Sequence, residues 1–219
     1  MLMRHVPTAP PYRLAIFDFD GTLADTLPWL LTLLEDIAAR FDIPGAAGLE
    51  IDEMRGLSAR EIVARLGIPA WKLPRIAAHV HRLAAESDIA LFGHAHETLR
   101  SLHAQGIALA VVSSNGEAAV RRALGPRSAG LIGEFSCGAK LFGKACVFRG
   151  VVRRARAAAA QTICIGDEIR DGEAAHEAGL AFGAVSWGYN TPEALARTAP
   201  EHVFATMEEI VDVVGARVG

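Results

Sequence analysis

The sequence is short of several features that would point to other classes of protein. Its three cysteines, Cys137, Cys146 and Cys164, form no CxxC pair, so we expect reduced cysteines of a cytoplasmic protein rather than a zinc site or a disulfide framework. Although 51% of the 219 residues are hydrophobic, no long apolar stretch is free of charge, which argues against a membrane span. The formal charge of −3 gives no electrostatic case for nucleic acid as a partner.

The start of the chain lacks the apolar run of an export signal. Arg4 and His5 are followed by prolines instead. Because a secretory signal needs that run, we expect a cytoplasmic protein. At 219 residues the chain is long enough for one good-sized domain, or for a domain with a smaller insertion.

The most informative segment is residues 14–23, which read LAIFDFDGTL. The apolar residues up to Phe17 predict a buried strand, and Asp18, Asp20 and Gly21 follow it closely. A buried parallel strand ends at the sheet edge where ligands bind in open α/β folds. Two carboxylates there need a cation or a hydrogen-bond network, and their spacing suits a nucleophile beside an acid/base. The simpler alternative is a turn, because Asp and Gly both favour turns.

Beyond residue 91 the chain alternates between strand-like and helical segments. Between about residues 25 and 91 the pattern predicts only helices, at 26–41, from Ser58 to about 66 and from 69 to about 86. After it, strands are predicted at 107–112, 131–132, 162–165, 181–186 and 202–204, and the intervening helices include 117–124, 144–159 and 172–178. Such alternation predicts an α/β fold, a doubly wound, Rossmann-like parallel sheet built from 1–24 and 92–219. The segment 25–91 is then a small α-helical cap domain inserted after the first core strand.

Polar residues follow three of the predicted strands. They are Asp18 and Asp20 after the first strand, Ser113, Ser114 and Asn115 after the second, and Asp167 and Asp171 after the strand at 162–165. Lys144 opens the helix that precedes this last strand. Since parallel strands end at one edge of a sheet, these distant segments can build a single site.

With these segments in this order, the chain resembles the haloacid dehalogenase superfamily. The similarity is to its phosphatase and phosphomutase members with a helical cap in the first insertion position, and it covers nearly the whole chain. It implies that Asp18 is the nucleophile that becomes an aspartyl phosphate, a known use of carboxylates. It implies that Asp20 is the general acid/base. Ser113 would hydrogen-bond the phosphoryl group together with the amide of Ser114, unless Ser113 is only a helix cap or Ser114 carries the hydroxyl role.

The resemblance also implies Mg²⁺ as the cofactor. The cation prefers oxygen ligands, here the carboxylate of Asp18, the backbone carbonyl of Asp20 and the carboxylate of Asp167. Asp171 would support them through a metal-bound water. The alternative for Asp171 is an acidic residue in the first turn of a helix, where negative charge is favourable.

The lysine of the family pattern is harder to assign, because lysine occurs only at Lys72, Lys140 and Lys144. The family usually shows Lys-Pro, and no proline follows either Lys140 or Lys144. Lys144 begins a predicted helix at about the family distance before Asp167, whereas Lys140 lies in a Gly-rich stretch and would lengthen the connection. We therefore favour Lys144 as the phosphate-binding lysine and keep Lys140 as the alternative.

Two further segments resemble parts of related proteins. Residues 55–58, RGLS, are similar to the cap loop that faces the active site in related phosphatases and in beta-phosphoglucomutase. Arg55 there could hold a substrate carboxylate or second phosphate, or it could be solvated surface. Residues 187–189, WGY, resemble a loop of phosphoglycolate phosphatases, with ordinary core packing as the alternative.

The leading interpretation is a Mg²⁺-dependent phosphatase acting on a small phosphorylated metabolite, phosphoglycolate-like by resemblance. A haloacid dehalogenase is disfavoured because that branch lacks the second aspartate that Asp20 supplies. A phosphomutase of the beta-phosphoglucomutase type uses the same core residues, and a non-catalytic metabolite-binding protein could share the fold. We expect a monomer or a homodimer, with neither nucleic acid nor a membrane as partner.

Overall fold

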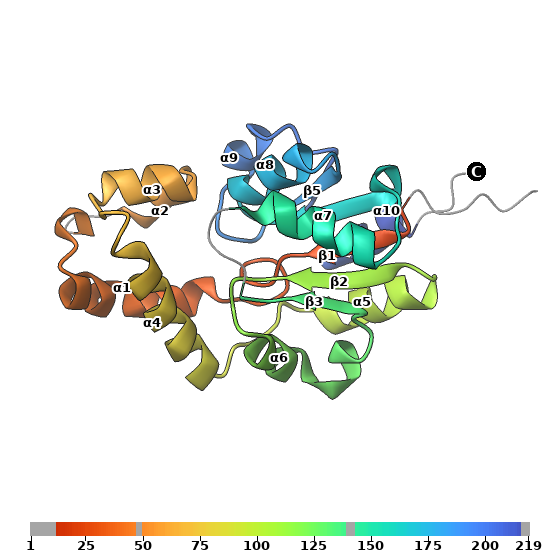
Figure 1. Cartoon of the computed structure of the whole chain (residues 1–219), viewed down its shortest axis with the longest axis horizontal. Helices are drawn as coiled ribbons and strands as arrows, with labels where there is room; N and C mark the ends of the chain where they lie inside the picture. Colours follow the sequence, from red (N-terminus) through yellow and green to blue (C-terminus); the bar gives the residue numbers. More distant parts are fainter. Residues whose placement is uncertain (1–11, 47–49, 139–142, 216–219) are drawn as a thin grey trace, which may run out of the picture.

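The computed structural model describes residues 12–46, 50–138 and 143–215 of the chain. At its centre lies a six-stranded sheet in which all paired neighbours run parallel, in the order β3-β2-β1-β4-β5-β6 (Figure 1). The strands are β1 (Leu14–Phe17), β2 (Ala108–Val112), β3 (Glu134–Ser136), β4 (Thr162–Gly166), β5 (Ala181–Val185) and β6 (His202–Phe204). The predicted α/β class with a doubly wound parallel sheet is confirmed.

Helices cover both faces of the sheet because successive strand residues point to opposite sides. Ala15 and Phe17 pack with α5, α6 and α10, whereas Leu14 and Ile16 pack with α7, α8 and α9. These helices are α5 (Ala95–Ala104), α6 (Glu117–Ala129), α7 (Lys144–Arg154), α8 (Ile169–Glu177), α9 (Pro192–Ala196) and α10 (Met207–Val214). Since both faces are covered, β1 is apolar throughout and fully buried, and the first polar side chains come directly after its end.

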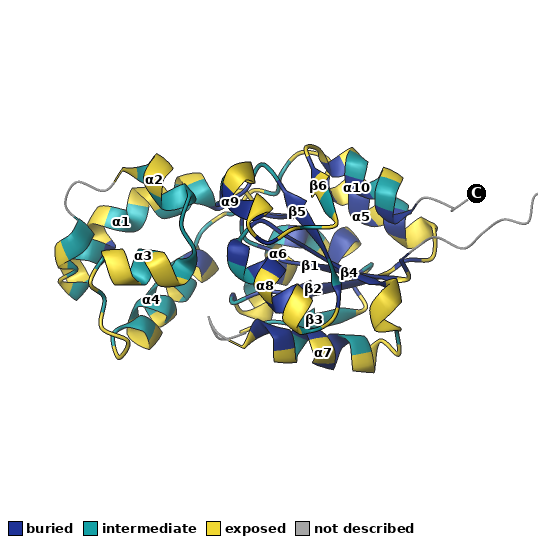
Figure 2. Cartoon of the chain, turned by 90° about the horizontal axis from the view of Figure 1, so that it is seen from above, coloured by how far each residue is buried: buried dark blue, intermediate teal, exposed yellow. Residues whose placement is uncertain are grey.

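A second group of helices lies beside the sheet, beyond the ends of the strands (Figure 1). It consists of α1 (Leu27–Phe41), a short 3₁₀ turn (Pro44–Ala46), α2 (Ile51–Arg55), α3 (Ala59–Arg65) and α4 (Leu73–Glu86). Among the described residues of these helices only Ile37 and Ala84 are buried, in contrast to the densely buried sheet (Figure 2). The group therefore has a thin core of its own.

The chain enters and leaves this helical group at neighbouring points. Ala24 and Leu91 form an antiparallel bridge. On either side of it, Asp25 N donates to Ala90 O at 2.9 Å and Phe92 N donates to Leu23 O at 2.9 Å. We refer to this paired segment as the linker bridge.

Local signals explain where several helices begin. Ser58 caps α3 as predicted, because its Oγ accepts from Glu61 N at 3.3 Å while Ser58 N donates to Glu61 Oε2 at 2.7 Å. The helix predicted from residue 69 begins later, at Leu73, because residues 70–72 form turns before it. Within the described residues no helix is both long and apolar enough to cross a bilayer.

Two sequence predictions were wrong in position. The strand expected at 131–132 lies at β3 instead, because Leu131 and Ile132 pack against the core from a turn and not from the sheet. Two apolar residues carry no periodicity that could separate these cases. The helix expected to reach about 159 ends at Arg154, and the left-handed Arg156 (φ 53°) prevents its continuation.

Candidate active site

The predicted site residues follow adjacent strands at one edge of the sheet. Phe17 is in register with Val111 of β2 on one side and with Ile165 of β4 on the other. Asp18, Ser113 and Asp167 therefore follow three neighbouring strands. This is the arrangement in which open α/β sheets bind ligands.

Asp18 is the first residue after β1 and is buried. Its backbone N–H donates to Ile165 O at 2.9 Å, and its side chain is only 5% exposed. One carboxylate oxygen, Oδ1, lies 3.0 Å from Lys144 Nζ, while the buried Oδ2 has no hydrogen-bond partner. Burial raises the pKa of Asp18 to about 7, although the Lys144 ammonium acts in the opposite direction. The unpartnered Oδ2 is an acceptor that can bind a ligand.

Lys144, the first residue of α7, sits between two acids. Its ammonium lies 3.0 Å from Asp18 Oδ1 and donates to Asp171 Oδ1 at 2.6 Å. Burial disfavours the ammonium, but the carboxylates of Asp171 and Asp18 outweigh this and raise the pKa of Lys144. The other oxygen of Asp171 accepts from Glu168 N at 3.1 Å, which fixes Asp171 in the first turn of α8.

Asp167 is fully buried and held at both oxygens. Thr22 Oγ1 donates to Oδ1 at 2.7 Å, and Tyr189 N donates to Oδ2 at 2.7 Å. Two glycines make room for it: a Cβ on Gly21 would lie 2.1 Å from Oδ2, and one on Gly188 would lie 2.2 Å from the Asp167 Cβ. These positions require glycine because a side chain would collide with the carboxyl group.

Asp18, Asp167 and Asp171 form a group that fits a divalent cation. One carboxylate oxygen from each lies within 4.8 Å of the others, and all three residues are buried. Burial, followed by repulsion from Glu168 and Asp171, raises the pKa of Asp167 well above its usual range. The orphaned Asp18 Oδ2 and the all-oxygen donor set match the preference of a hard cation.

Asp20 lies in the same loop, with its carboxylate bound to Asn115, which the sequence placed at a strand end without a role of its own. Asn115 Nδ2 donates to Asp20 Oδ1 at 2.9 Å and to Oδ2 at 2.8 Å. Burial raises the pKa of Asp20, while Arg170 and the bonds from Asn115 act to lower it. Asn115 follows the Ser-Ser pair after β2, and its place at a strand end was the only sequence signal for it.

The remaining predicted phosphate-binding residues are placed as follows. Ser113 is fully buried at the end of β2, and its Oγ accepts from Asn115 N at 3.0 Å. Ser114 is half-buried beside it. Lys140 lies outside the described residues, so the structure makes no comparison between it and Lys144. The catalytic roles of these residues stay predictions.

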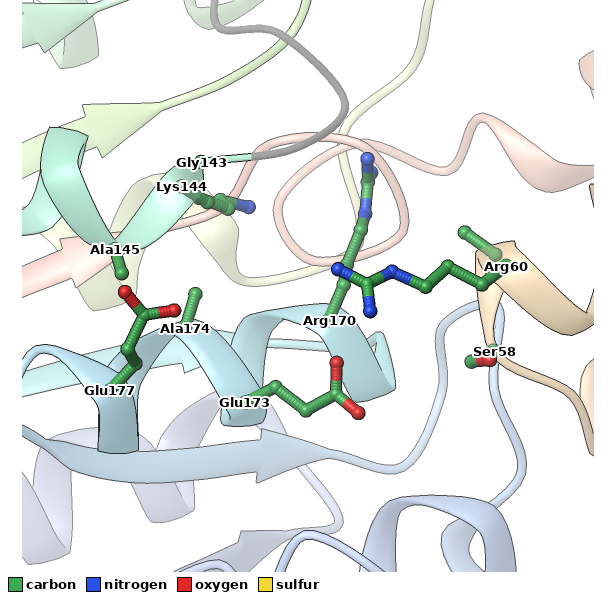
Figure 3. Close-up of a pocket in the computed structure, with 10 residues that line it drawn as sticks. Ser58, Arg60, Gly143, Lys144, Ala145, Arg170, Glu173, Ala174 and Glu177 are labelled. Carbon is green, nitrogen blue, oxygen red and sulfur yellow. The ribbon is translucent and has the colours of Figure 1, made fainter. Parts of the chain in front are cut away.

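Arg55 has a different environment from the expected one. Its Nε donates to Tyr189 O at 3.1 Å and its Nη2 to Gly188 O at 3.1 Å, so these donors serve a contact between α2 and the loop after β5. A pocket between α3 and the start of α7 and α8 is lined by the cations Arg60, Lys144 and Arg170 and by the acids Glu173 and Glu177, but not by Arg55 (Figure 3). Arg170, also missed in the sequence, donates through Nε to Glu168 Oε1 at 2.9 Å.

The chain matches a known protein family. The sequence profile described as Haloacid dehalogenase-like hydrolase matches residues 15–185. A phosphoglycolate phosphatase from Synechococcus elongatus is 30% identical over 204 residues, which cover 91% of this chain and 95% of that protein. Another from Pseudomonas fluorescens is 28% identical over 218 residues, or 91% of this chain and 78% of that protein.

Solved structures share the fold. A protein from Bacteroides fragilis described as a haloacid dehalogenase-like hydrolase has a TM-score of 0.76 at 22% identity, covering 91% of this chain and 99% of its own. CbbY from Rhodobacter sphaeroides, solved in complex with phosphate, has a TM-score of 0.67 at 20% identity, covering 91% and 96%. At such identities the likeness extends to the fold alone.

We predict that Gly188→Ala disturbs the site through Asp167. The new Cβ would lie 2.2 Å from the Asp167 Cβ, and overpacking of this kind costs about 1–3 kcal/mol. Thermal unfolding should show a lower Tm. Gly93→Ala is the control, because no atom lies within 4 Å of its new Cβ, and its Tm should stay at or above that of the wild type. Equal Tm values for the two variants would contradict the packing argument.

Proposed function

The chain belongs to the haloacid dehalogenase-like hydrolase family and is a phosphatase of that family, and we propose that it hydrolyses a small phosphoglycolate-like phosphomonoester with the help of Mg²⁺. The observation that carries the proposal is the environment of Asp18. Its carboxylate lies 3.0 Å from the Lys144 ammonium and close to two further buried acids, with one oxygen unpartnered. A carboxylate kept in this way suits a nucleophile that works beside a cation.

The proposed reaction has two displacements. In the first, a carboxylate oxygen of Asp18 forms a bond to phosphorus while the bond between phosphorus and the leaving alcohol oxygen breaks. Asp20 gives its proton to that oxygen, and an aspartyl phosphate remains. In the second, Asp20 takes a proton from water as the water oxygen bonds to phosphorus. The acyl phosphate bond breaks, which releases inorganic phosphate and regenerates Asp18.

The other residues of the site hold the reacting groups. Asn115 donates to both oxygens of Asp20 and so fixes the orientation of this side chain. Lys144 would balance negative charge on the phosphoryl oxygens, while Ser113 and the amide of Ser114 would hydrogen-bond them. Asp18 and Asp167, with Asp171 in support, would hold Mg²⁺, which when bound lowers the repulsion between a carboxylate and a dianionic phosphate.

The relatives support the proposed substrate class. The phosphoglycolate phosphatases from Synechococcus elongatus and Pseudomonas fluorescens match over most of their length, and the sequence segment WGY at 187–189 resembles a loop of such enzymes.

The test is release of phosphate from a panel of phosphorylated metabolites. Phosphoglycolate should be among the fastest substrates, and release should require Mg²⁺ and stop with EDTA. Ca²⁺ should not replace Mg²⁺, because it accepts higher and looser coordination. Full activity in metal-free buffer would contradict the proposed requirement for Mg²⁺. Transfer of phosphate between sugar positions, seen by product analysis, would point to a mutase instead.

Replacement of Asp18 by Asn should abolish turnover and leave the fold intact. The amide has the same shape but is a poor nucleophile, and Lys144 keeps its bond to Asp171. Asp20→Asn should slow the reaction by about 10²- to 10⁴-fold, the usual contribution of proton transfer. Steady-state kinetics with circular dichroism as the folding check decides both. An active Asp18→Asn variant would rule out the aspartyl phosphate.

Lys144→Ala should lower kcat by about 10²-fold or more, as expected when an electrostatic donor to the transition state is lost. Lys72→Ala is the matched control: Lys72 Nζ binds the backbone carbonyls of Phe41 at 2.8 Å and Asp42 at 2.9 Å, away from the site. It should retain activity close to that of the wild type. If Lys140→Ala lowered kcat strongly and Lys144→Ala left it unchanged, Lys140 and not Lys144 would be the phosphate-binding lysine.

A further inference from the structure

The loop after β5 touches both the inserted helices and the metal-site carboxylate. Within it, Tyr189 makes three contacts at three different atoms. Its N–H donates to Asp167 Oδ2 at 2.7 Å, its carbonyl accepts from Arg55 Nε at 3.1 Å, and its hydroxyl lies 2.7 Å from Thr26 Oγ1. Thr26 is the residue before α1, and Arg55 is the last residue of α2. Tyr189 therefore connects Asp167 to both ends of the α1–α2 segment.

Asn190, the next residue, forms the most complete junction. It is 4% exposed, and its Nδ2 donates to Arg55 O at 2.8 Å and to Leu57 O at 2.9 Å. Its Oδ1 accepts from Ile169 N, the first residue of α8, at 2.9 Å. Its backbone N–H donates to Asp167 O at 3.2 Å. A single amide side chain thus binds the 55–57 turn and the start of the helix that carries Asp171.

These contacts are reciprocal across the interface. Arg55 donates to the carbonyls of Gly188 and Tyr189, and its own carbonyl accepts from Asn190 and from Thr191 N at 3.0 Å. Displacing the 55–57 turn would remove all of these bonds together. The Tyr189 N–H would then lose the support that aims it at Asp167.

We infer that Asn190 and Arg55 are positioning residues that couple docking of the inserted helices to the orientation of Asp167 for its cation. The inference rests on the proposed function, because it takes Asp167 as a metal ligand. By linkage, a cation that binds the docked form better also strengthens docking by the same factor. The RGLS and WGY segments are thereby two halves of one contact.

A matched pair of arginine variants tests this coupling. Arg55→Ala and Arg197→Ala each remove one positive charge and hydrogen bonds to the same interface. The Arg197 side chain, however, donates to Gly56 O and to Glu61 Oε1, each at 3.3 Å, rather than to the 187–190 loop. Asn190→Ala, which changes no charge, is the second test variant.

The measurement is Mg²⁺ affinity of the full-length protein by isothermal titration calorimetry without substrate, with the Tm of each metal-free variant as a folding check. Arg55→Ala and Asn190→Ala should raise the Kd for Mg²⁺ by about tenfold, the lower range for groups that orient metal ligands. Arg197→Ala should leave it unchanged. If Asn190→Ala does not fold, Arg55→Ala against Arg197→Ala decides.

The possible failures are distinguishable. An unchanged Kd in Arg55→Ala and Asn190→Ala, with a wild type that binds Mg²⁺ and releases phosphate, would overturn the coupling and leave the phosphatase proposal standing. An equal loss of Mg²⁺ affinity in Arg197→Ala would also overturn the coupling. Docking of the inserted helices in general, and not the contacts of the 187–190 loop, would then set the affinity. A wild type that binds no Mg²⁺ would overturn both proposals.

Discussion

The ion pairs of Lys144 with Asp18 and Asp171 are the interaction on which the rest of the site depends. Three buried acids lie together at the end of the central strands, and unpaired buried charge is strongly destabilising. One ammonium can neutralise only part of this charge. The raised pKa values of Asp18 and Asp167 reflect this burial, and a bound cation would favour their ionised forms.

Hydrogen bonds from side chains and backbone, together with small residues, hold the carboxyl groups of the site in place. Thr22 and Tyr189 hold the two oxygens of Asp167, Asn115 holds those of Asp20, and small residues leave the carboxyl groups their space. Groups fixed in this way lose little freedom when a ligand arrives, which favours electrostatic stabilisation of a transition state. The same loop that orients Asp167 also receives the inserted helices, so the closure of the site and its internal geometry are not independent.

The sequence predicted what depends on local pattern. The apolar run of β1 ending at Asp18 and the strand-helix alternation led to the correct fold class, and Lys144 follows from helix-start signals beside a glycine. The roles of Asn115 and Arg55 could not be predicted, because each depends on a partner far away in the chain. Arg170 was missed because its place at the pocket depends on how distant segments come together. Arg55 illustrates this: its neighbours in sequence are those of a substrate-facing loop, yet two of its donors bind carbonyls of residues 188 and 189. The misplaced third strand had two apolar residues, too few to reveal a period.

The linker bridge between Ala24 and Leu91 has a consequence for how the fold can vary. When the two ends of a segment are held side by side, the entropic cost of closing that segment rises only slowly with its length. The helices between these residues can therefore differ in number, length or type without moving β1 or its neighbour β2. The strands that carry the proposed catalytic residues can thus stay in place while the inserted helices vary, provided that the contact with the loop after β5 is kept.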